Sequence, residues 1–412
     1  RNVSASSRIG RFTTMESAEL RELLTPEGVA LLNSLPEYTT NTDVLKMVAS
    51  LRKEGNSPSL VATVLTQAKL RSKAATKFGD FAQRMLFTEA GLEQATRLPV
   101  AALHAGRYVR AGLTSVADLG CGIGADALAF AGAGLRVRAV DADEVTAAIT
   151  TYNLAPFPEA EVLHCTAEDA DLSDVESVYL DPARRTSGHT NTSRLAKSED
   201  YSPSLDFAFG LAEKFPTGIK LGPGFDRDLI PDDCEAQWIS VGGDVVEVGL
   251  WFGPLKREGI TRAALIMNSD GMHELTAAAD SADAEVGDLG KYLYEPDGAV
   301  IRARLIGDLA RSLGTLMLDE HIAYMSSDSE VHSPFATTFE VDQEFALDVK
   351  VLAKELKTRG IGTLEIKKRG VDIDPAEFRK KLSLSGKNSA TLFLTRLGER
   401  RVAILANRIT KK

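Results

Sequence analysis

Residues 118–124 form a glycine-rich segment whose residue types and spacing most directly suggest chemistry. The segment reads Asp-Leu-Gly-Cys-Gly-Ile-Gly, follows an apolar run and leads into a helix-like segment. Glycine accepts positive φ and lets the backbone approach a ligand closely, while the free N–H groups of a helix start form a polar cradle. Asp141 ends the next apolar run, about 20 residues after the turn, where a carboxylate can bind the ribose hydroxyls of a nucleotide. We therefore expect residues 113–145 to bind a nucleoside-containing cofactor.

Two kinds of cofactor fit this spacing. Gly120, Gly122 and Ala125 satisfy the G-x-G-x-x-A form of the dinucleotide fingerprint, so a nicotinamide or flavin dinucleotide is one alternative. Gly124 completes an alternating G-x-G-x-G, which resembles the first motif of class I S-adenosylmethionine (SAM) methyltransferases. Asp118 stands two residues before the first glycine, which adds to the resemblance. That family keeps an acidic residue at this position, near the amine at the methionine end of the cofactor. A site for pyrophosphate would gain nothing from this extra negative charge, so the sequence favours SAM.

The tetrad Asp181-Pro182-Ala183-Arg184 supplies the second set of residues with a chemical role. It follows the apolar run 178–180, where the fourth strand of such a fold should end, and resembles the (Asp/Asn)-Pro-Pro-(aromatic) motif of enzymes that methylate amines. In those enzymes, the acidic or amide side chain and a rigid proline-flanked carbonyl accept hydrogen bonds from the amine. Ala183 replaces the second proline and Arg184 the aromatic residue, although a guanidinium group can stack on a base or contact a phosphate. The alternative is a plain Asp-Pro turn followed by solvated arginines.

Three further segments leave alternatives open. Glu168 and Asp169 stand where the family places a polar group against adenine, but either can be an acid that favours a helix start. Lys220, at the end of the fifth predicted strand, begins a Lys-Leu-Gly-Pro-Gly segment that either lines an acceptor pocket or forms a turn. Residues 77–96 form either a lid over the cofactor or an interdomain linker.

A sheet must bring these residues together. Strand-like runs alternate with helical segments between residues 113 and 257, which predicts an α/β fold with a doubly wound, Rossmann-like sheet. The runs are 116–119, 137–140, 160–163, 178–180, 218–221 and 236–241. Ligands of such sheets bind beyond the carboxyl ends of the strands, so we expect the glycine turn, Asp141 and Asp181 to converge. We expect an N-terminal helical domain over 1–112 and an α+β module over 258–412, with a helix at about 344–358.

The amino-acid composition limits the classes of protein to which this chain can belong. The 412 residues are 44% apolar and 26% charged, which is typical of a globular protein with more than one core. The longest apolar runs fall short of the ~20 residues of a membrane helix, and the N-terminus lacks the apolar core of a signal peptide. Three scattered cysteines and no metal-spaced histidine pairs predict a cytoplasmic protein with reduced thiols and no metal site.

The charge distribution separates the C-terminus from the rest. Residues 350–412 carry 17 Lys+Arg against 6 Asp+Glu, whereas the remainder carries 31 against 52. This asymmetry indicates a nucleic-acid-binding module, with a solvated basic face as the alternative.

Together these segments resemble the bacterial class I SAM-dependent methyltransferases that end in a THUMP-like domain. Three later stretches carry the resemblance further: Val-Gly-Gly-Asp-Val-Val-Glu at 241–247, Tyr-Glu-Pro-Asp at 294–297 and Leu-Glu-Ile-Lys-Lys-Arg-Gly-Val at 364–371. The resemblance spans residues 40–410 and implies SAM as the donor and structured RNA as the acceptor, because THUMP modules bind structured RNA. Basic residues that could contact its phosphates are Lys367, Lys368, Arg369, Arg379, Lys380 and Lys381.

The sequence therefore predicts a SAM-dependent methyltransferase that modifies a base amine of ribosomal or transfer RNA. Asp118, Gly120, Gly122, Gly124 and Asp141 would hold SAM, and Asp181 with Pro182 would orient the acceptor. Two alternatives stay open. One is a methyltransferase acting on a small molecule or a protein, and the other is an RNA-binding module that keeps SAM as a non-catalytic ligand.

Overall fold

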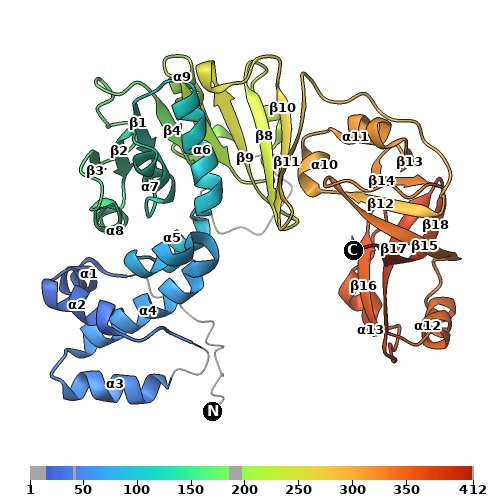
Figure 1. The fold of residues 1–412 in the computed structure, drawn as a ribbon, viewed down its shortest axis with the longest axis horizontal. Coiled ribbons are helices and arrows are strands. Elements are labelled where there is room, and N and C mark those ends of the chain that lie inside the picture. Colours follow the sequence, from blue (N-terminus) through green and yellow to red (C-terminus); the bar gives the residue numbers. More distant parts are fainter. Residues whose placement is uncertain (1–14, 40–42, 185–196, 411–412) are drawn as a thin grey trace, which may run out of the picture. The chain divides into compact units, whose positions relative to one another are not determined.

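The computed structural model describes residues 15–39, 43–184 and 197–410 (Figure 1). The chain divides into two compact units. The first unit comprises residues 1–220 with 252–255, and the second comprises residues 221–251 with 256–412. The division into three domains at residues 112 and 257 stays a prediction. Within the described residues, no helix is long and apolar enough to cross a membrane.

The first unit begins with helices, as the sequence pattern predicts. Helix α4 shows the local cause: the Ser57 side chain accepts a hydrogen bond from the Leu60 N–H, Pro58 occupies the first turn, and Gly79 ends the helix. Its buried face carries Val61 and Val64 at helical spacing. The helices are α1 (Ser17–Leu23), α2 (Pro26–Ser34), α3 (Val44–Lys53), α4 (Pro58–Phe78), η1 (Gly79–Arg84), α5 (Glu89–Gln94) and α6 (Leu98–Arg110).

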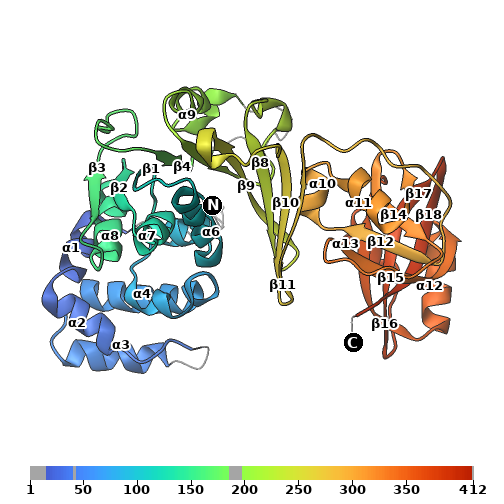
Figure 2. The ribbon, with the colours of Figure 1, turned by 45° about the horizontal axis from the view of Figure 1, so that its top comes forward.

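A parallel sheet follows these helices and positions the predicted cofactor residues. Its elements are β1 (Ser115–Leu119), α7 (Ala125–Gly132), β2 (Arg136–Asp141), α8 (Glu144–Leu154), β3 (Ala160–His164), β4 (Val178–Leu180), α9 (Leu205–Ala212) and β7 (Thr217–Leu221). The strands lie in the order β7-β4-β1-β2-β3 and pair in parallel. Figures 1 and 2 show α7 and α8 beside β1 to β3. The strand order reverses between β1 and β4, and ligands of such sheets bind at this switch point.

Short elements lie between β4 and β7 and farther along the chain. They are β5 (Ala183–Arg184), η2 (Ser198–Asp200), β6 (Tyr201–Ser202), η3 (Arg227–Leu229) and η4 (Gly253–Leu255). Strands β5 and β6 pair as a two-stranded antiparallel ribbon directly after Asp181 and Pro182.

The second unit contains an antiparallel hairpin. It joins β8 (Glu235–Val241) to β9 (Asp244–Phe252) through Gly242 and Gly243, which both have positive φ. A second hairpin, β10 (Arg262–Asn268) with β11 (Gly271–Ala277), was not predicted, and β10 pairs with β8 in parallel.

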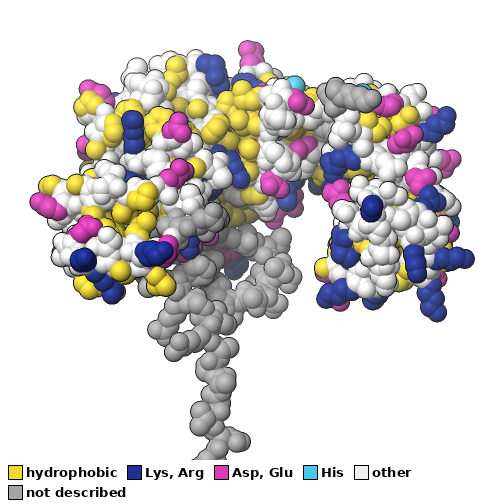
Figure 3. All heavy atoms as spheres, turned by 60° about the horizontal axis from the view of Figure 1, so that its bottom comes forward, with side chains coloured by type: hydrophobic (Ala, Val, Ile, Leu, Met, Phe, Trp, Pro, Cys, Tyr) yellow, Lys and Arg dark blue, Asp and Glu magenta, His cyan; other side chains and the backbone are white. Residues whose placement is uncertain are grey.

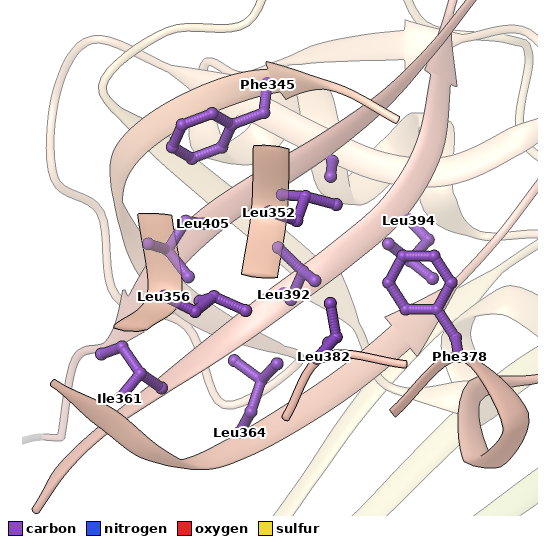
Figure 4. Close-up of a cluster of buried hydrophobic side chains, with 11 residues drawn as sticks. Phe345, Leu352, Leu356, Ile361, Leu364, Phe378, Leu382, Leu392, Leu394 and Leu405 are labelled. Carbon is purple, nitrogen blue, oxygen red and sulfur yellow. The ribbon is translucent and has the colours of Figure 1, made fainter. Parts of the chain in front are cut away.

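A seven-stranded sheet forms the rest of the second unit. Its elements are β12 (Tyr292–Pro296), α10 (Gly298–Arg302), α11 (Ile306–Leu313), β13 (Leu316–Asp319), β14 (Ile322–Ser327), β15 (Ala336–Ala346), α12 (Val349–Thr358), β16 (Ile361–Lys368), α13 (Pro375–Lys380), β17 (Asn388–Leu397) and β18 (Arg400–Arg408). The strand order is β13-β14-β12-β15-β18-β17-β16. Figure 4 shows the core cluster of buried side chains, with Leu352 and Leu356 of α12 among side chains from β15 to β18 and Phe378 of α13.

One predicted boundary in this module was wrong. The expected helix at about 344–358 begins only at Val349, because residues 344–346 complete β15. That strand contains two threonines, two phenylalanines and one valine, residue types that favour a pleated surface. The side chain of Asp348 then accepts hydrogen bonds from the N–H groups of Lys350 and Val351 and so fixes the helix start.

Candidate cofactor and acceptor site

The glycine turn joins β1 to α7 in a conformation that only glycine adopts readily. Gly120, Gly122 and Gly124 have φ values of +86°, +56° and +87°. A Cβ atom on Gly124 would also lie 2.9 Å from Cγ2 of Thr150 on α8. Helix α7 begins directly after Gly124, so the turn delivers backbone N–H groups to the carboxyl end of β1.

Asp141 ties the end of β2 to this turn. One carboxylate oxygen, Oδ2, accepts a hydrogen bond from the Gly122 N–H at 3.0 Å, and Oδ1 accepts one from the Asp143 N–H at 2.9 Å. Partial burial raises the pKa of Asp141, and these two backbone hydrogen bonds act against that rise. The carboxylate is therefore held in one orientation beside the turn, and its remaining lone pairs can accept further hydrogen bonds.

Asp118 brings a buried carboxyl group to the same place. Its residue is only 1% exposed, and its Oδ2 atom has no hydrogen-bond partner among the residues that the structure describes. Burial raises the pKa of Asp118 well above its ordinary value, and the charges of Asp126, Asp181 and Asp141 raise it further. A buried, unpaired carboxylate is costly, so a cationic group placed beside Asp118 would be strongly favoured.

Asp181 lies at the end of β4, next to the glycine turn. A Cβ atom on Gly120 would lie 3.8 Å from the backbone oxygen of Asp181. The Asp181 Oδ2 atom lies 2.6 Å from Nζ of Lys220 on the neighbouring strand β7. Pro182 is buried, and the side chain of Arg184 lies outside the described part of the structure. The predicted convergence of Asp118, Asp141 and Asp181 on the glycine turn is thus present in the geometry.

A buried polar network behind the turn was missed by the sequence reasoning. Asp126, in the first turn of α7, has its Oδ1 atom 2.7 Å from Nδ1 of His104 on α6, and its Oδ2 accepts a hydrogen bond from the Thr96 hydroxyl at 2.7 Å. The Tyr179 hydroxyl of β4 lies 3.2 Å from the same histidine nitrogen. Burial acts to raise the pKa of Asp126, but the bonds to His104 and Thr96 outweigh it and lower that pKa. This network fixes α6, α7 and β4 relative to one another.

The segment for which a lid or a linker was expected is fixed beside the turn, and its role stays a prediction. Leu86 and Phe87 are fully buried. Asn153 of α8 accepts a hydrogen bond from the Leu86 N–H at 2.8 Å and donates to the backbone oxygens of Leu86 and Ile123 at 3.1 and 2.9 Å. Ile123 belongs to the glycine turn, so one amide side chain joins the N-terminal helices, α8 and the turn.

Comparison with known proteins identifies relatives of the chain. A family model described as "THUMP domain-like" matches residues 336–408, and one described as a domain of unknown function (DUF8688) matches residues 16–74. An uncharacterized S-adenosylmethionine-dependent methyltransferase of Mycobacterium tuberculosis (strain H37Rv) is 34% identical over 356 residues, which covers 83% of this chain and 93% of that protein. The chain belongs to the SAM-dependent methyltransferases with a THUMP-like C-terminal domain.

A solved structure agrees with the fold of this methyltransferase. A protein from Porphyromonas gingivalis W83, described as a proposed methyltransferase, matches with a TM-score of 0.66 at 19% identity. The match covers 90% of this methyltransferase and 100% of the other chain. The Rossmann-like α/β fold, the helical N-terminal part and the THUMP-like C-terminal module expected from the sequence are confirmed.

The residues of the methyltransferase fit SAM as a cofactor. The unpaired Oδ2 atom of Asp118 suits an ammonium group, and SAM carries one at its methionine end. Asp169 is exposed, and its Oδ2 accepts a hydrogen bond from the Thr166 hydroxyl at 2.8 Å in the turn after β3, while Glu168 is exposed beside it. Which of Glu168 and Asp169 faces adenine stays a prediction.

The basic residues of the C-terminal module have distinct environments. Lys367 lies 2.7 Å from the Glu295 carboxylate, and Arg369 lies 3.7 Å from it, so two of the stretches that carry the family resemblance meet in an ion-pair cluster. Arg379 donates a hydrogen bond to the backbone oxygen of Leu364. The exposed members of the predicted set are Lys368, Arg379, Lys380 and Lys381. Figure 3 shows Lys and Arg side chains spread over the surface of the C-terminal module.

Proposed function

We propose that this methyltransferase transfers the methyl group of SAM to a base amine of structured RNA, ribosomal or transfer RNA, in the cytoplasm. One observation carries the proposal: Asp181 lies at the end of β4 with its backbone directly beside the glycine turn, and its carboxylate is close enough to Asp118 for the two charges to interact. SAM supplies a methyl group on a sulfonium, which is already activated for displacement. The protein must therefore hold the acceptor in line with that methyl group and exclude water.

The cofactor end of the site would use charge and backbone contacts. Asp118 would pair with the ammonium group at the methionine end, and Asp141 would accept hydrogen bonds from the ribose hydroxyls. The left-handed glycines let the backbone approach the cofactor without steric conflict. The remaining candidates at this end are Gly120, Gly122, Gly124, Glu168 and Asp169.

The acceptor end would use Asp181 and the backbone beside Pro182. An ionised carboxylate accepts hydrogen bonds from an amine and so directs the nitrogen lone pair toward the methyl group. Pro182, the residue after Asp181, is buried, and its ring restricts the backbone that follows the carboxylate. Arg184, as predicted from the sequence, would stack on the base or contact a phosphate.

The THUMP-like module supports RNA as the acceptor. Residues 350–412 carry a net positive charge in a chain whose overall charge is −10, and phosphate contacts provide sequence-independent affinity. Exposed lysines such as Lys368, Lys380 and Lys381 would position the RNA. The Asp181 site would select the base that is methylated.

Replacing Asp181 with alanine tests the assignment of roles. We expect Asp181→Ala to abolish methyl transfer to RNA while the affinity for SAM, measured by isothermal titration calorimetry, stays within a few-fold. Asp171→Ala is a matched control, because Asp171 is an exposed aspartate after β3 whose side chain contacts a neighbouring backbone N–H. A collapse of SAM affinity in Asp181→Ala would show that Asp181 binds the cofactor and that the acceptor role is wrong.

One observation favours a second candidate, a methyltransferase acting on a small molecule or a protein. Glu295 partly neutralises Lys367 and Arg369, two of the six residues predicted to contact phosphate. A salt titration of RNA binding separates the candidates. RNA binding that falls linearly on a log–log plot against salt, and that weakens in a Lys368→Gln, Lys380→Gln, Lys381→Gln variant, supports RNA. No RNA affinity at low salt would favour the second candidate.

A further inference from the structure

Lys220 occupies the position opposite Asp181 across two adjacent parallel strands. The register pairs Leu180 of β4 with Ile219 of β7, so the residues that follow, Asp181 and Lys220, lie level at the carboxyl ends of their strands. The Lys220 Nζ atom lies 2.6 Å from the Asp181 Oδ2 atom, and the lysine side chain is only 11% exposed. This contact is short, and its lysine end is largely shielded from water, whereas the Asp181 side chain is 33% exposed.

The surroundings of Lys220 are rich in acids. Its positive charge acts to lower the pKa values of both Asp118 and Asp126, and it also lowers that of a neighbouring cation, Lys77. Burial is the main reason that the pKa of Lys77 falls to about 8, and the Lys77 ammonium donates to three backbone oxygens in and after α5. Among the described residues, the charged and titratable groups around this end of the sheet include Asp118, Asp126, Asp141, Asp181, Lys77, His104, Tyr108, Tyr179 and Cys121.

A purely structural role explains this ion pair poorly. A buried salt bridge adds little net stability, because removing both charges from water costs about as much as their attraction returns. Successive side chains of a strand point to opposite faces, so Lys220 lies on the other face of β7 from the fully buried Ile219. A lysine here has its clearest effect on the carboxylate that it contacts.

We propose that Lys220 is a positioning residue, whose ammonium group holds the Asp181 carboxylate as the anion in the orientation that accepts a hydrogen bond from the acceptor amine. This inference rests on the proposed acceptor role of Asp181. Without Lys220, the neighbouring carboxylates would repel the Asp181 charge and favour its protonated form. A protonated Asp181 has one acceptor oxygen fewer for the amine.

The test compares Lys220→Met, which removes the charge, with Lys220→Arg, which keeps it. We expect Lys220→Met to move the acidic limb of the kcat-versus-pH profile upward by about one to three pH units, the usual effect of losing an opposite charge beside a carboxylate. Lys220→Arg should keep the wild-type profile and most of the activity. Lys256→Met is the matched control, because the Lys256 ammonium contacts only the backbone oxygen of Asp233 among the hydrogen bonds of the described residues. Circular dichroism of each variant checks folding.

A second readout does not depend on methyl transfer. Because Lys220 also lowers the pKa of Asp118, Lys220→Met should weaken SAM binding more at acidic pH than at alkaline pH. If no RNA is ever methylated, the proposed function fails while this binding readout still reports on Lys220. An unchanged pH profile together with an unchanged pH dependence of binding would overturn the inference. So would a Lys220→Arg variant that binds SAM normally and transfers no methyl group, since lysine would then be needed as a proton acceptor.

Discussion

Replacing Asp118 with asparagine should stabilise the ligand-free protein and weaken cofactor binding at the same time. Asparagine keeps the shape of the side chain and removes a buried charge whose Oδ2 atom has no partner among the described residues. The pKa of Asp118 in the folded protein is raised well above 3.8, first by burial. At pH values between 3.8 and the raised pKa, the folded state holds more protons than the unfolded state. Stability therefore falls as pH rises through this range. Asparagine does not titrate, so the variant does not lose stability in this way as pH rises.

The size of both effects follows from the cost of an unpaired buried group. At about pH 8 we expect Asp118→Asn to be more stable than the wild type by about 1–3 kcal/mol. In a unit of this size, each kcal/mol of added stability raises Tm by about 2–4 °C. The gain should shrink as pH falls toward 3.8, and below that pH Asp118 is protonated in both states. Loss of a charge-assisted hydrogen bond, worth about 1.5–3 kcal/mol, should weaken SAM binding by about 10- to 150-fold.

Two measurements decide this prediction. Urea denaturation of the ligand-free protein at about pH 5 and about pH 8 gives the stability difference and its pH dependence, and calorimetric titration gives the SAM affinity. Asp171→Asn is the control, because Asp171 is exposed and hydrogen bonds to Ser173 lower its pKa, which is the opposite direction. A variant that is less stable than the wild type at pH 8, or that binds SAM as tightly, would refute the role given to Asp118.

Two further substitutions test the geometry around the turn. Gly124→Ala should cost about 1–2 kcal/mol for the left-handed backbone, with additional loss from the clash against α8, and should weaken SAM binding. Gly132→Ala in α7 has open space and serves as its control, so equal stability losses in urea would contradict the strain argument. Asn153→Ala should cost about 2–4 kcal/mol by leaving backbone groups of Leu86 and Ile123 unpaired. Faster hydrogen exchange at the Leu86 amide should accompany that loss, and unchanged exchange would show that Asn153 does not fix the segment.

The convergence of the glycine turn and Asp141 could be predicted because its signals are local in the sequence. The glycine turn is one continuous segment, and Asp141 lies one helix and one strand after it, so their convergence follows from a single strand-helix-strand unit. The left-handed φ values that the three glycines adopt are the conformations for which glycine is selected.

The polar partners of these residues could not be predicted, because they depend on strand order and helix packing. The contact between Asp181 and Lys220 requires β7 to lie beside β4, and a strand sequence alone does not specify its neighbour. His104 and Asp126 are 22 residues apart on different helices. In the C-terminal module, the contact of Glu295 with Lys367 joins β12 to β16, so a basic cluster in the sequence becomes partly neutralised in the fold.

Mass spectrometry of RNA nucleosides tests the central claim most directly. Ribosomal and transfer RNA would be digested from cells that contain the protein, cells that lack it, and cells that carry Asp181→Ala in its place. We predict one methylated base that is present with the wild-type protein and absent from the other two strains, while purified Asp181→Ala still binds SAM. Identical nucleoside profiles in all three strains would contradict the account.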